Sequence, residues 1–176
     1  MNYKYLYLSG FALIGSLIIF ALHKEIIIIN RAQTISTTNA QGSSQKKQVV
    51  FFYWNNAWHT DNLLMVIPEQ KDDAFYLIIN RWLQLVSDEK ILKKKTALQS
   101  ALISCNKQEL FLSFDRAPWN KNSSIYEKWM IIEGILKTVK NSDSHIKKIY
   151  FLCDHAPMQD THLDFTNAWP IDGFLK

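Results

Sequence analysis

The feature that most limits how this chain folds is an apolar segment near its start. Residues 5–22, YLYLSGFALIGSLIIFAL, contain no charged side chain over 18 positions. A helix of that length comes close to the roughly 30 Å thickness of the hydrocarbon core of a bilayer. His23, Lys24 and Glu25 end the segment. The segment predicts a membrane anchor over residues 1–25 that crosses the membrane once and is not cleaved. The alternatives are a cleaved signal peptide and a buried core helix.

The charge of the chain is concentrated before residue 49. The net charge is +4 at pH 7, and residues 1–48 account for all of it, with five basic residues against Glu25. Residues 49–176 carry 15 basic and 15 acidic side chains and are neutral. A neutral domain lacks the general electrostatic attraction to phosphate backbones that nucleic-acid-binding proteins use. We therefore expect no nucleic-acid partner.

Composition divides the rest of the chain into a linker and one domain. Residues 26–48 open with a short isoleucine block and continue with Ser, Thr, Asn, Gln and Gly. Such a segment buries too little apolar surface to offset the entropy cost of ordering it. It predicts a flexible linker. Residues 49–176 are rich in aliphatic and aromatic side chains and predict one compact domain.

Strand and helix patterns alternate within this domain. Runs of β-branched and aromatic residues predict strands, the first of them buried on both faces. Helical spacing predicts two helices, the first capped by Asp72 or Asp73 and the second preceded by the capping-box sequence of Ser124. Glu133 stands four residues before Lys137, where a supporting ion pair is expected. The expected strands are 49–54, 63–67, 98–104, 109–115 and 146–153, and the expected helices are 72–87 and 125–142.

The order β-β-α-β-β-α-β predicts the fold class. It is typical of an α+β domain of two layers, in which two helices pack on one face of a mainly antiparallel sheet. Strands 98–104 and 109–115 are expected to form a hairpin. Alternation along the second of them places Leu110, Leu112 and Phe114 on the core face.

Histidine and carboxylate side chains gather in the C-terminal tail. Together they suit a metal site or a general acid–base pair, so the alternative function is a small membrane-anchored hydrolase. Their spacing matches no tight metal motif, and neither G-x-S-x-G nor a Gly-rich phosphate loop occurs. We expect a solvated loop, no enzyme, and no catalytic, cofactor-binding or metal-binding residue. The cluster consists of Asp154, His155, Asp160, His162 and Asp164, and His59 falls in an expected loop between the first two strands.

The chain has two cysteines, Cys105 and Cys153, each at the end of an expected strand. If those strand ends are neighbours, a disulfide could close a long loop in an oxidising compartment. The alternative is a pair of thiols that behave as small hydrophobic side chains. The sequence leaves both open.

Several polar landmarks follow one another in the second half of the domain. They are Leu112-Ser-Phe-Asp115, a helix bearing Thr138, a strand reading Ile149-Tyr-Phe-Leu-Cys-Asp154, and His162-Leu-Asp-Phe165. In this order the stretch resembles the GerMN domain of sporulation and germination proteins. The resemblance covers about residues 49–170 and is less specific in its first half.

The chain also departs from the GerMN pattern. Lys90 to Lys95 stands where the family usually has Gly-Pro, His155 stands where it has Gly, and no lipid-bearing Cys follows the apolar segment. The resemblance implies an extracytoplasmic, non-catalytic domain that is similar to the ring-building modules of envelope complexes. It implies no catalytic residues.

Two functions are therefore weighed: the hydrolase above, and a membrane-tethered interaction or assembly domain. The second places the chain at the bacterial cytoplasmic membrane, single-pass, with the domain outside the cytoplasm and with protein partners or self-association. Edge strands and the aromatic residues of expected loops, Trp58 and Trp119, are the expected contact sites. Basic residues flank the apolar segment on both sides, Lys4 before it and Lys24 and Arg31 after it, and do not fix its orientation.

Overall fold

The computed structural model describes residues 44–92 and 94–173 of the chain. The expected membrane-spanning segment at residues 5–22 lies outside them. Within the described residues, no helix is both long and apolar enough to cross a membrane. The chain divides into two units, residues 1–41 and 42–176, and the second contains every described element.

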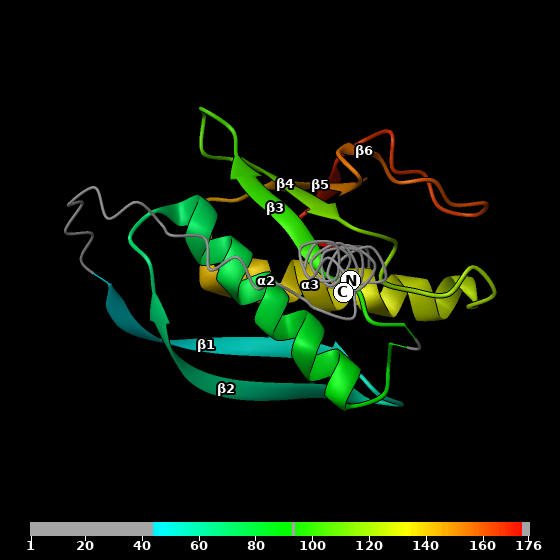
Figure 1. Ribbon diagram of the computed structural model, residues 1–176, viewed down its shortest axis with the longest axis horizontal. Helices are drawn as coiled ribbons and strands as arrows, with labels where there is room; N and C mark the ends of the chain where they lie inside the picture. The colour runs from blue at the N-terminus through cyan, green and yellow to red at the C-terminus, as the bar shows by residue number, and fades with distance from the viewer. Residues whose placement is uncertain (1–43, 93, 174–176) are drawn as a thin grey trace, which may run out of the picture. The chain divides into compact units, whose positions relative to one another are not determined.

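Strands β1 (Gln45–Trp54) and β2 (Trp58–Ile67) form an antiparallel ribbon (Figure 1). Ten residue pairs run in one unbroken register, from Gln45 opposite Ile67 to Trp54 opposite Trp58. Only residues 55–57 connect the strands, and Asn56 takes the left-handed backbone, φ 57°, that such tight turns require. The ribbon is therefore long, regular and free of bulges.

The ribbon corrects three expectations. β1 begins at Gln45, so residues 45–48, expected in the linker, are strand. Trp58 and His59, expected in a loop, lie in β2, because the turn is shorter than their polar neighbours suggested. β1 is not buried on both faces: Val49 and Phe51 are buried and the residues between and after them are half-buried. The reason is that β1 belongs to a two-stranded ribbon and not to the centre of the main sheet.

The remaining strands form a second, five-stranded sheet in the order β3-β4-β5-β6, with β7 also on β5. The β3–β4 hairpin is confirmed, and Leu110, Leu112 and Phe114 are buried as expected. The sheet is mixed, however, because α3 connects β4 to β5 by a crossover and the two run parallel. The strands are β3 (Leu98–Ile103), β4 (Glu109–Phe114), β5 (Lys148–Cys153), β6 (Ala156–Pro157) and β7 (Trp169–Pro170).

Helices α2 (Lys71–Asp88) and α3 (Ile125–Ser142) lie between the ribbon and the main sheet (Figure 1). The expected two-layer arrangement is thus replaced by helices with β structure on both sides. This explains why α3 is buried almost all round, including Lys128 and Glu133. Glu133, expected to form a supporting ion pair with Lys137, is 2% exposed.

The helix starts differ from each other. At α3 the capping box is confirmed, since the Ser124 side chain accepts from the Glu127 N–H and the Glu127 side chain accepts from the Ser124 N–H. At α2 the N-cap is Gln70, without a side-chain bond, and not Asp72 or Asp73. Asp72 instead accepts a hydrogen bond from the backbone N–H of Ile103 at 2.9 Å.

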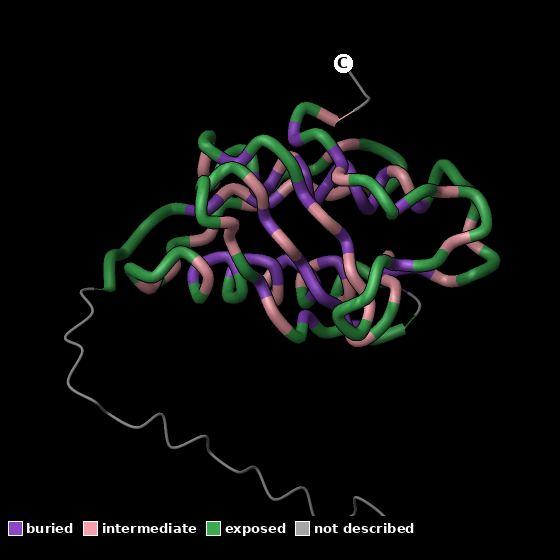
Figure 2. The backbone as a smooth tube through the Cα atoms, turned by 90° about the horizontal axis from the view of Figure 1, so that it is seen from above, coloured by how far each residue is buried: buried purple, intermediate pink, exposed green. Residues whose placement is uncertain are grey.

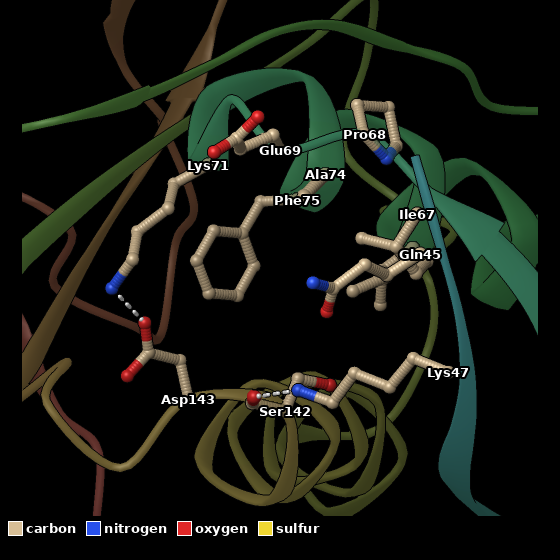
Figure 3. Close-up of a pocket in the computed structure, with 11 residues that line it drawn as sticks. Gln45, Lys47, Ile67, Pro68, Glu69, Lys71, Ala74, Phe75, Ser142 and Asp143 are labelled. Atoms are coloured by element: carbon tan, nitrogen blue, oxygen red, sulfur yellow. Dashed lines mark hydrogen bonds and ion pairs between the residues drawn. The ribbon is translucent and has the colours of Figure 1, made fainter. Parts of the chain in front are cut away.

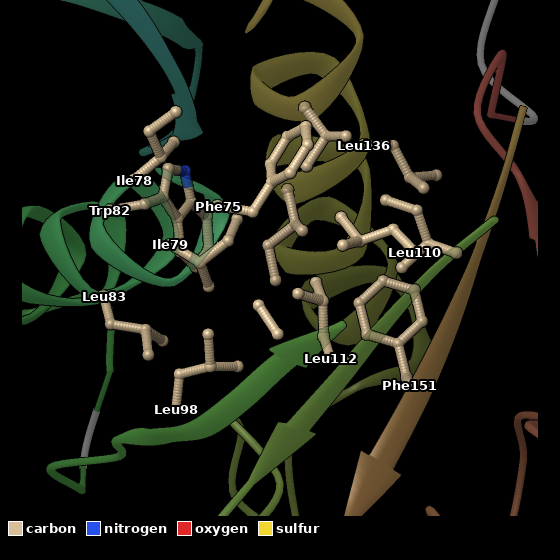
Figure 4. Close-up of a cluster of buried hydrophobic side chains, with 14 of the residues drawn as sticks. Phe75, Ile78, Ile79, Trp82, Leu83, Leu98, Leu110, Leu112, Leu136 and Phe151 are labelled. Carbon is tan, nitrogen blue, oxygen red and sulfur yellow. The ribbon is translucent and has the colours of Figure 1, made fainter. Parts of the chain in front are cut away.

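The hydrophobic core lies where α2, α3 and the main sheet meet (Figure 4). Trp82 and Ile79 of α2, Leu136 of α3 and Leu112 of β4 are all essentially inaccessible. Burial of each such side chain contributes on the order of 2–3 kcal/mol. In Figure 2 the buried stretches follow the inner strands and helices, and the exposed ones follow the turns and loops.

The C-terminal tail extends this core beyond β5. Phe165 stacks between Trp119 and Trp169, with ring centroids 5.5 Å apart on each side, and Phe151 meets both Phe165 and Trp169 edge-on. Phe165 is 3% exposed. The tail is therefore anchored by aromatic packing between its polar residues and is not a freely solvated loop.

Candidate functional site

The structure does not assemble the histidines and carboxylates of the tail into a site. His155 and Asp154 are exposed in the turn after β5, and the backbone N–H of His155 donates to the Ser113 hydroxyl at 2.9 Å. Asp160, His162 and Asp164 line an open hollow of about 360 Å³ that Asp154 and His155 do not reach. Among the described residues no group of three or more His, Cys, Asp or Glu side chains is placed to hold a metal ion.

The tail carboxylates are occupied by structural hydrogen bonds. Asp164 accepts from the backbone and hydroxyl of Thr166, and these bonds lower the pKa of its carboxyl. Asp160 accepts from Lys128, Trp119 and the His162 N–H. Burial raises the pKa of Asp160, but these hydrogen bonds outweigh it and hold the pKa below its usual value. Such carboxylates fix the tail and are poorly suited to accept a proton in catalysis.

The two cysteines are free thiols. Cys105 is exposed in the turn between β3 and β4, and Cys153 is the last residue of β5. Because β4 and β5 are parallel, with Glu109 opposite Lys148 and Phe114 opposite Cys153, the two thiols lie at opposite ends of the sheet. The disulfide alternative is therefore wrong for this fold.

Side chains from the helices satisfy the outer edges of β1 and β3. On β1, the Phe52 N–H donates to the Thr138 hydroxyl at 3.0 Å, and the Phe52 carbonyl accepts from the Trp82 indole at 2.7 Å. On β3, the N–H groups of Leu98 and Ile103 donate to Asn80 and Asp72. Neither strand is thus open to a further strand along these positions.

The second edge of β2 is different, because among the described residues no strand pairs with it. Both backbone groups of Phe52 point away from β2, so Phe52 and Thr60 form a non-hydrogen-bonded pair. The regular register then directs the backbone N–H and C=O groups of every second β2 residue away from β1. We call this surface the free β2 edge; its residues are Trp58, Thr60, Asn62, Leu64 and Val66.

The side chains of the free β2 edge are unusual for an exposed strand. Leu64 is 71% exposed and Val66 is 53% exposed. None of the five residues is charged, no Pro interrupts the strand, and the register has no bulge. Natural edge strands generally carry Lys, Pro or a bulge at such positions to prevent pairing. An edge of this kind is suited to pair with another strand.

A pocket of about 300 Å³ opens at the other end of the ribbon, between β1, the start of α2 and the end of α3 (Figure 3). Its floor is apolar and includes Phe75 and Ile67. Two lysines cross its rim: Lys71 binds Asp143 at 2.6 Å, and Lys47 donates to the Ser142 carbonyl at 2.8 Å. Both ammonium groups are thus engaged within the domain.

The Lys71–Asp143 pair changes the titration of the carboxylate. Burial of Asp143 acts to raise its pKa, but hydrogen bonds from Lys71 and from the backbone and ring of His145 lower the pKa to about 2. Asp143 is therefore charged at physiological pH and closes the rim of the pocket. It is not a general acid or base at neutral pH.

The tryptophans expected as contact residues have separate roles. Trp58 is half-buried on β2, and the Lys137 ammonium lies 5.2 Å from its ring centroid. Trp119, expected in a loop, is 9% exposed and stacks on Phe165. Trp58 therefore belongs to the free β2 edge, and Trp119 belongs to the tail core.

No protein-family profile matches the chain, and no curated protein matches it. Among solved structures, a protein from Clostridium perfringens, inferred to be a lipoprotein, matches with 16% identity and a TM-score of 0.44, over 74% of this chain and 89% of that one. The tandem GerMN domains of the sporulation protein GerM from Bacillus subtilis match with 13% identity and a TM-score of 0.46, over 78% of this chain and 49% of that one. The first GerMN domain of GerM matches with 13% identity and a TM-score of 0.43, over 70% and 97%.

The similarity to GerMN domains expected from the sequence is thus confirmed among solved structures. This chain spans about half the length of the tandem GerM structure. Because every TM-score lies below 0.5, the function proposed below depends on the contacts and surfaces of the domain itself.

Proposed function

We propose that the chain is a non-catalytic assembly domain, tethered to the cytoplasmic membrane by residues 5–22, in which the free β2 edge pairs with the same edge of a second copy. The observation that carries this proposal is the contrast between the strand edges. Helix side chains bind backbone groups on the outer edges of β1 and β3. The outer edge of the ten-residue strand β2 instead carries five residues, none of them charged. Its domain acts outside the cytoplasm, as the GerMN resemblance implies.

The sequence of β2 suits pairing with itself. In an antiparallel pair centred on Asn62, Thr60 faces Leu64 of the partner and Trp58 faces Val66 of the partner. The strand's single carboxylate, Asp61, then faces Leu63 and not a second Asp61. No like charges meet, and exposed apolar side chains are covered on both copies. Membrane tethering raises the effective concentration of the copies, so a modest pairing energy is enough.

The hydrolase alternative has less support. It requires His155 and His162 to converge with carboxylates in one pocket, but only His162 lines the hollow of the tail. Asp160 and Asp164 in that hollow are engaged with Lys128 and Thr166. The side chains of the described residues thus support assembly more directly than acid–base chemistry.

Cysteine cross-linking tests the pairing in the membrane. Asn62→Cys is introduced into the full-length chain with Cys105→Ser and Cys153→Ser, so that it is the sole thiol. If Asn62 faces Asn62 of the partner, mild oxidation gives a disulfide-linked dimer, because Cα atoms opposite each other in a ladder lie about 4.5–5.5 Å apart. Asn141→Cys, exposed near the end of α3, is the matched control and is expected to stay monomeric. Equal cross-linking of the two variants would contradict the proposal.

Topology is tested separately. A C-terminal alkaline phosphatase fusion, which is active only outside the cytoplasm, is expected to be active in cells expressing the full chain. An inactive phosphatase fusion, together with an active C-terminal fusion to a reporter that works only in the cytoplasm, would contradict the extracytoplasmic placement. The pairing of β2 would still be judged by the cross-linking.

A further inference from the structure

A second pocket lies at the turn end of the ribbon. It has a volume of about 260 Å³ and is formed by four segments: the β1–β2 turn, the end of α2, the loop before α3, and the first turns of α3. Pockets for drug-sized ligands usually measure about 300–1,000 Å³. This one therefore suits a single ring-sized group.

Two tryptophans form part of its wall. Trp119 is fixed by stacking on Phe165 and by the hydrogen bond from its indole N–H to Asp160 at 3.2 Å. Trp54 is half-buried and is held edge-on by Trp58, at 5.6 Å, and by Tyr126, at 6.0 Å. The aromatic wall is therefore held in place before any ligand binds, which lowers the entropy cost of binding.

The rim of the pocket carries polar groups with unused hydrogen-bonding capacity. Among the described residues, no partner binds the side-chain amides of Asn55 and Asn56. Asn120 adds a third amide, whose oxygen accepts the backbone N–H of Asn122 at 3.4 Å and whose NH₂ group has no partner among the described residues. Glu127 accepts the Ser124 N–H through Oε2, which leaves its other carboxylate oxygen to a ligand. Each amide supplies both donors and an acceptor.

Lys90 completes the rim, at the position where the backbone N–H of Ile91 closes the end of α2 by donating to the Val86 carbonyl at 2.9 Å. Lys90 holds a left-handed backbone, φ 59°, directly after α2, where helices generally place Gly. Lys90 and Glu127 are the charged residues that line the pocket, and their charges sum to zero.

We infer that this pocket binds one sugar ring of a neutral glycan. A sugar ring presents an apolar C–H face, which packs on the face of an indole, and a ring of hydroxyls, which both donate and accept hydrogen bonds. The pocket offers the same combination: fixed indole rings beside amides, a carboxylate and an ammonium. With one cation and one anion among its lining residues the pocket has no excess positive charge to favour an anionic ligand. A Pro-rich peptide requires an extended groove and not a pocket for one ring.

The inference is tested with the full-length chain and short soluble sugars. Chitotriose and cellotriose are titrated against the protein and followed by tryptophan fluorescence and calorimetry. Binding is expected in the micromolar to millimolar range. Trp54→Ala and Asn120→Ala are each expected to weaken it at least tenfold, and Tyr76→Ala, an exposed aromatic on α2 outside the pocket, is expected to leave it unchanged. Binding of chitotriose alone would assign the acetamido group to the amides of the rim.

Lys90→Gly provides a variant whose failure cannot be ascribed to unfolding. Removing the strained side chain is expected to raise the melting temperature while weakening sugar binding severalfold, because a hydrogen-bond donor is lost. The inference is overturned if neither sugar binds the folded wild-type chain, if a proline-rich peptide binds there and the sugars do not, or if Trp54→Ala and Asn120→Ala both bind sugar with wild-type affinity.

Discussion

The Lys128 ammonium lies 2.7 Å from Oδ2 of Asp160, and both side chains are buried, 0% and 6% exposed. The pair joins the first half of α3 to the C-terminal tail, 32 residues later in the chain. Trp119 and the backbone of His162 supply two more hydrogen bonds to the same carboxylate. The most buried charge in the described domain is thus held by a residue that the sequence places in the polar His/Asp cluster of the tail.

Breaking this pair is expected to be costly. Asp160→Asn leaves the buried ammonium without a counter-charge and should lower the free energy of unfolding by about 3 kcal/mol. Lys128→Met with Asp160→Leu removes both charges and should cost less than the single change, because no charge is left buried alone. Urea unfolding of the three proteins measures this order; a single substitution that costs under about 0.5 kcal/mol, typical of exposed pairs, would contradict it.

The pair of Lys71 with Asp143 predicts a pH dependence. The pKa of Asp143 is lowered to about 2, from 3.8. Since the folded state binds this proton less readily than the unfolded state, the pair stabilises the fold above about pH 4, and the stabilisation is lost as the pH falls toward 2. Lys71 is half exposed, which reduces the expected contribution to about 1 kcal/mol.

Unfolding of the wild type and of Asp143→Asn between pH 2 and pH 7 tests this dependence. The difference in their free energies of unfolding is expected to be constant above about pH 4 and to shrink at lower pH. A difference that stays constant down to pH 2 would show that Asp143 does not have a lowered pKa.

Gly134 allows α3 to approach β1. A Cβ on Gly134 would lie 2.8 Å from the carbonyl oxygen of Phe52, which also accepts the Trp82 indole N–H, and 3.0 Å from the Trp82 ring. Gly134→Ala gains about 1 kcal/mol of helix propensity but overpacks this contact at a cost of about 1–3 kcal/mol. We expect a net loss of about 1 kcal/mol in chemical denaturation. Asn141→Ala, at an exposed position of the same helix, is the control and should be neutral or stabilising; equal stabilisation by both would contradict the close contact.

The local elements of this fold could be predicted from the sequence, and their long-range pairing could not. Helical spacing placed α2 within one residue at each end, and the capping box placed the start of α3. Alternation also identified the buried face of β4. Each of these signals lies within a few residues of the element that it predicts.

The pairing of the strands has no such local signal. Nothing around Val49 indicates that β1 and β2 leave the main sheet, and nothing around Ile149 indicates that β5 runs parallel to β4. For the candidate site, the sequence points to Trp58 as a contact residue but places Leu64 and Val66 only in a strand. The signal that could have identified them is a strand with uncharged alternate positions and no Lys or Pro, which becomes meaningful only when its edge is known to be open.

Pairing through the free β2 edge is the central claim, and sedimentation equilibrium of the full-length chain in mild detergent tests it most directly. The substitution is Leu64→Lys, at a side chain that is 71% exposed, so the free energy of unfolding should change by less than about 0.5 kcal/mol. The matched control is Leu102→Lys, 56% exposed on β3, whose edge is capped by Asn80 and Asp72. We expect the wild type and the Leu102→Lys variant to be dimers, and the Leu64→Lys variant to be a monomer that associates at least tenfold more weakly. A Leu64→Lys protein that dimerises as tightly as the wild type would contradict the pairing. So would a wild type that is monomeric at every concentration.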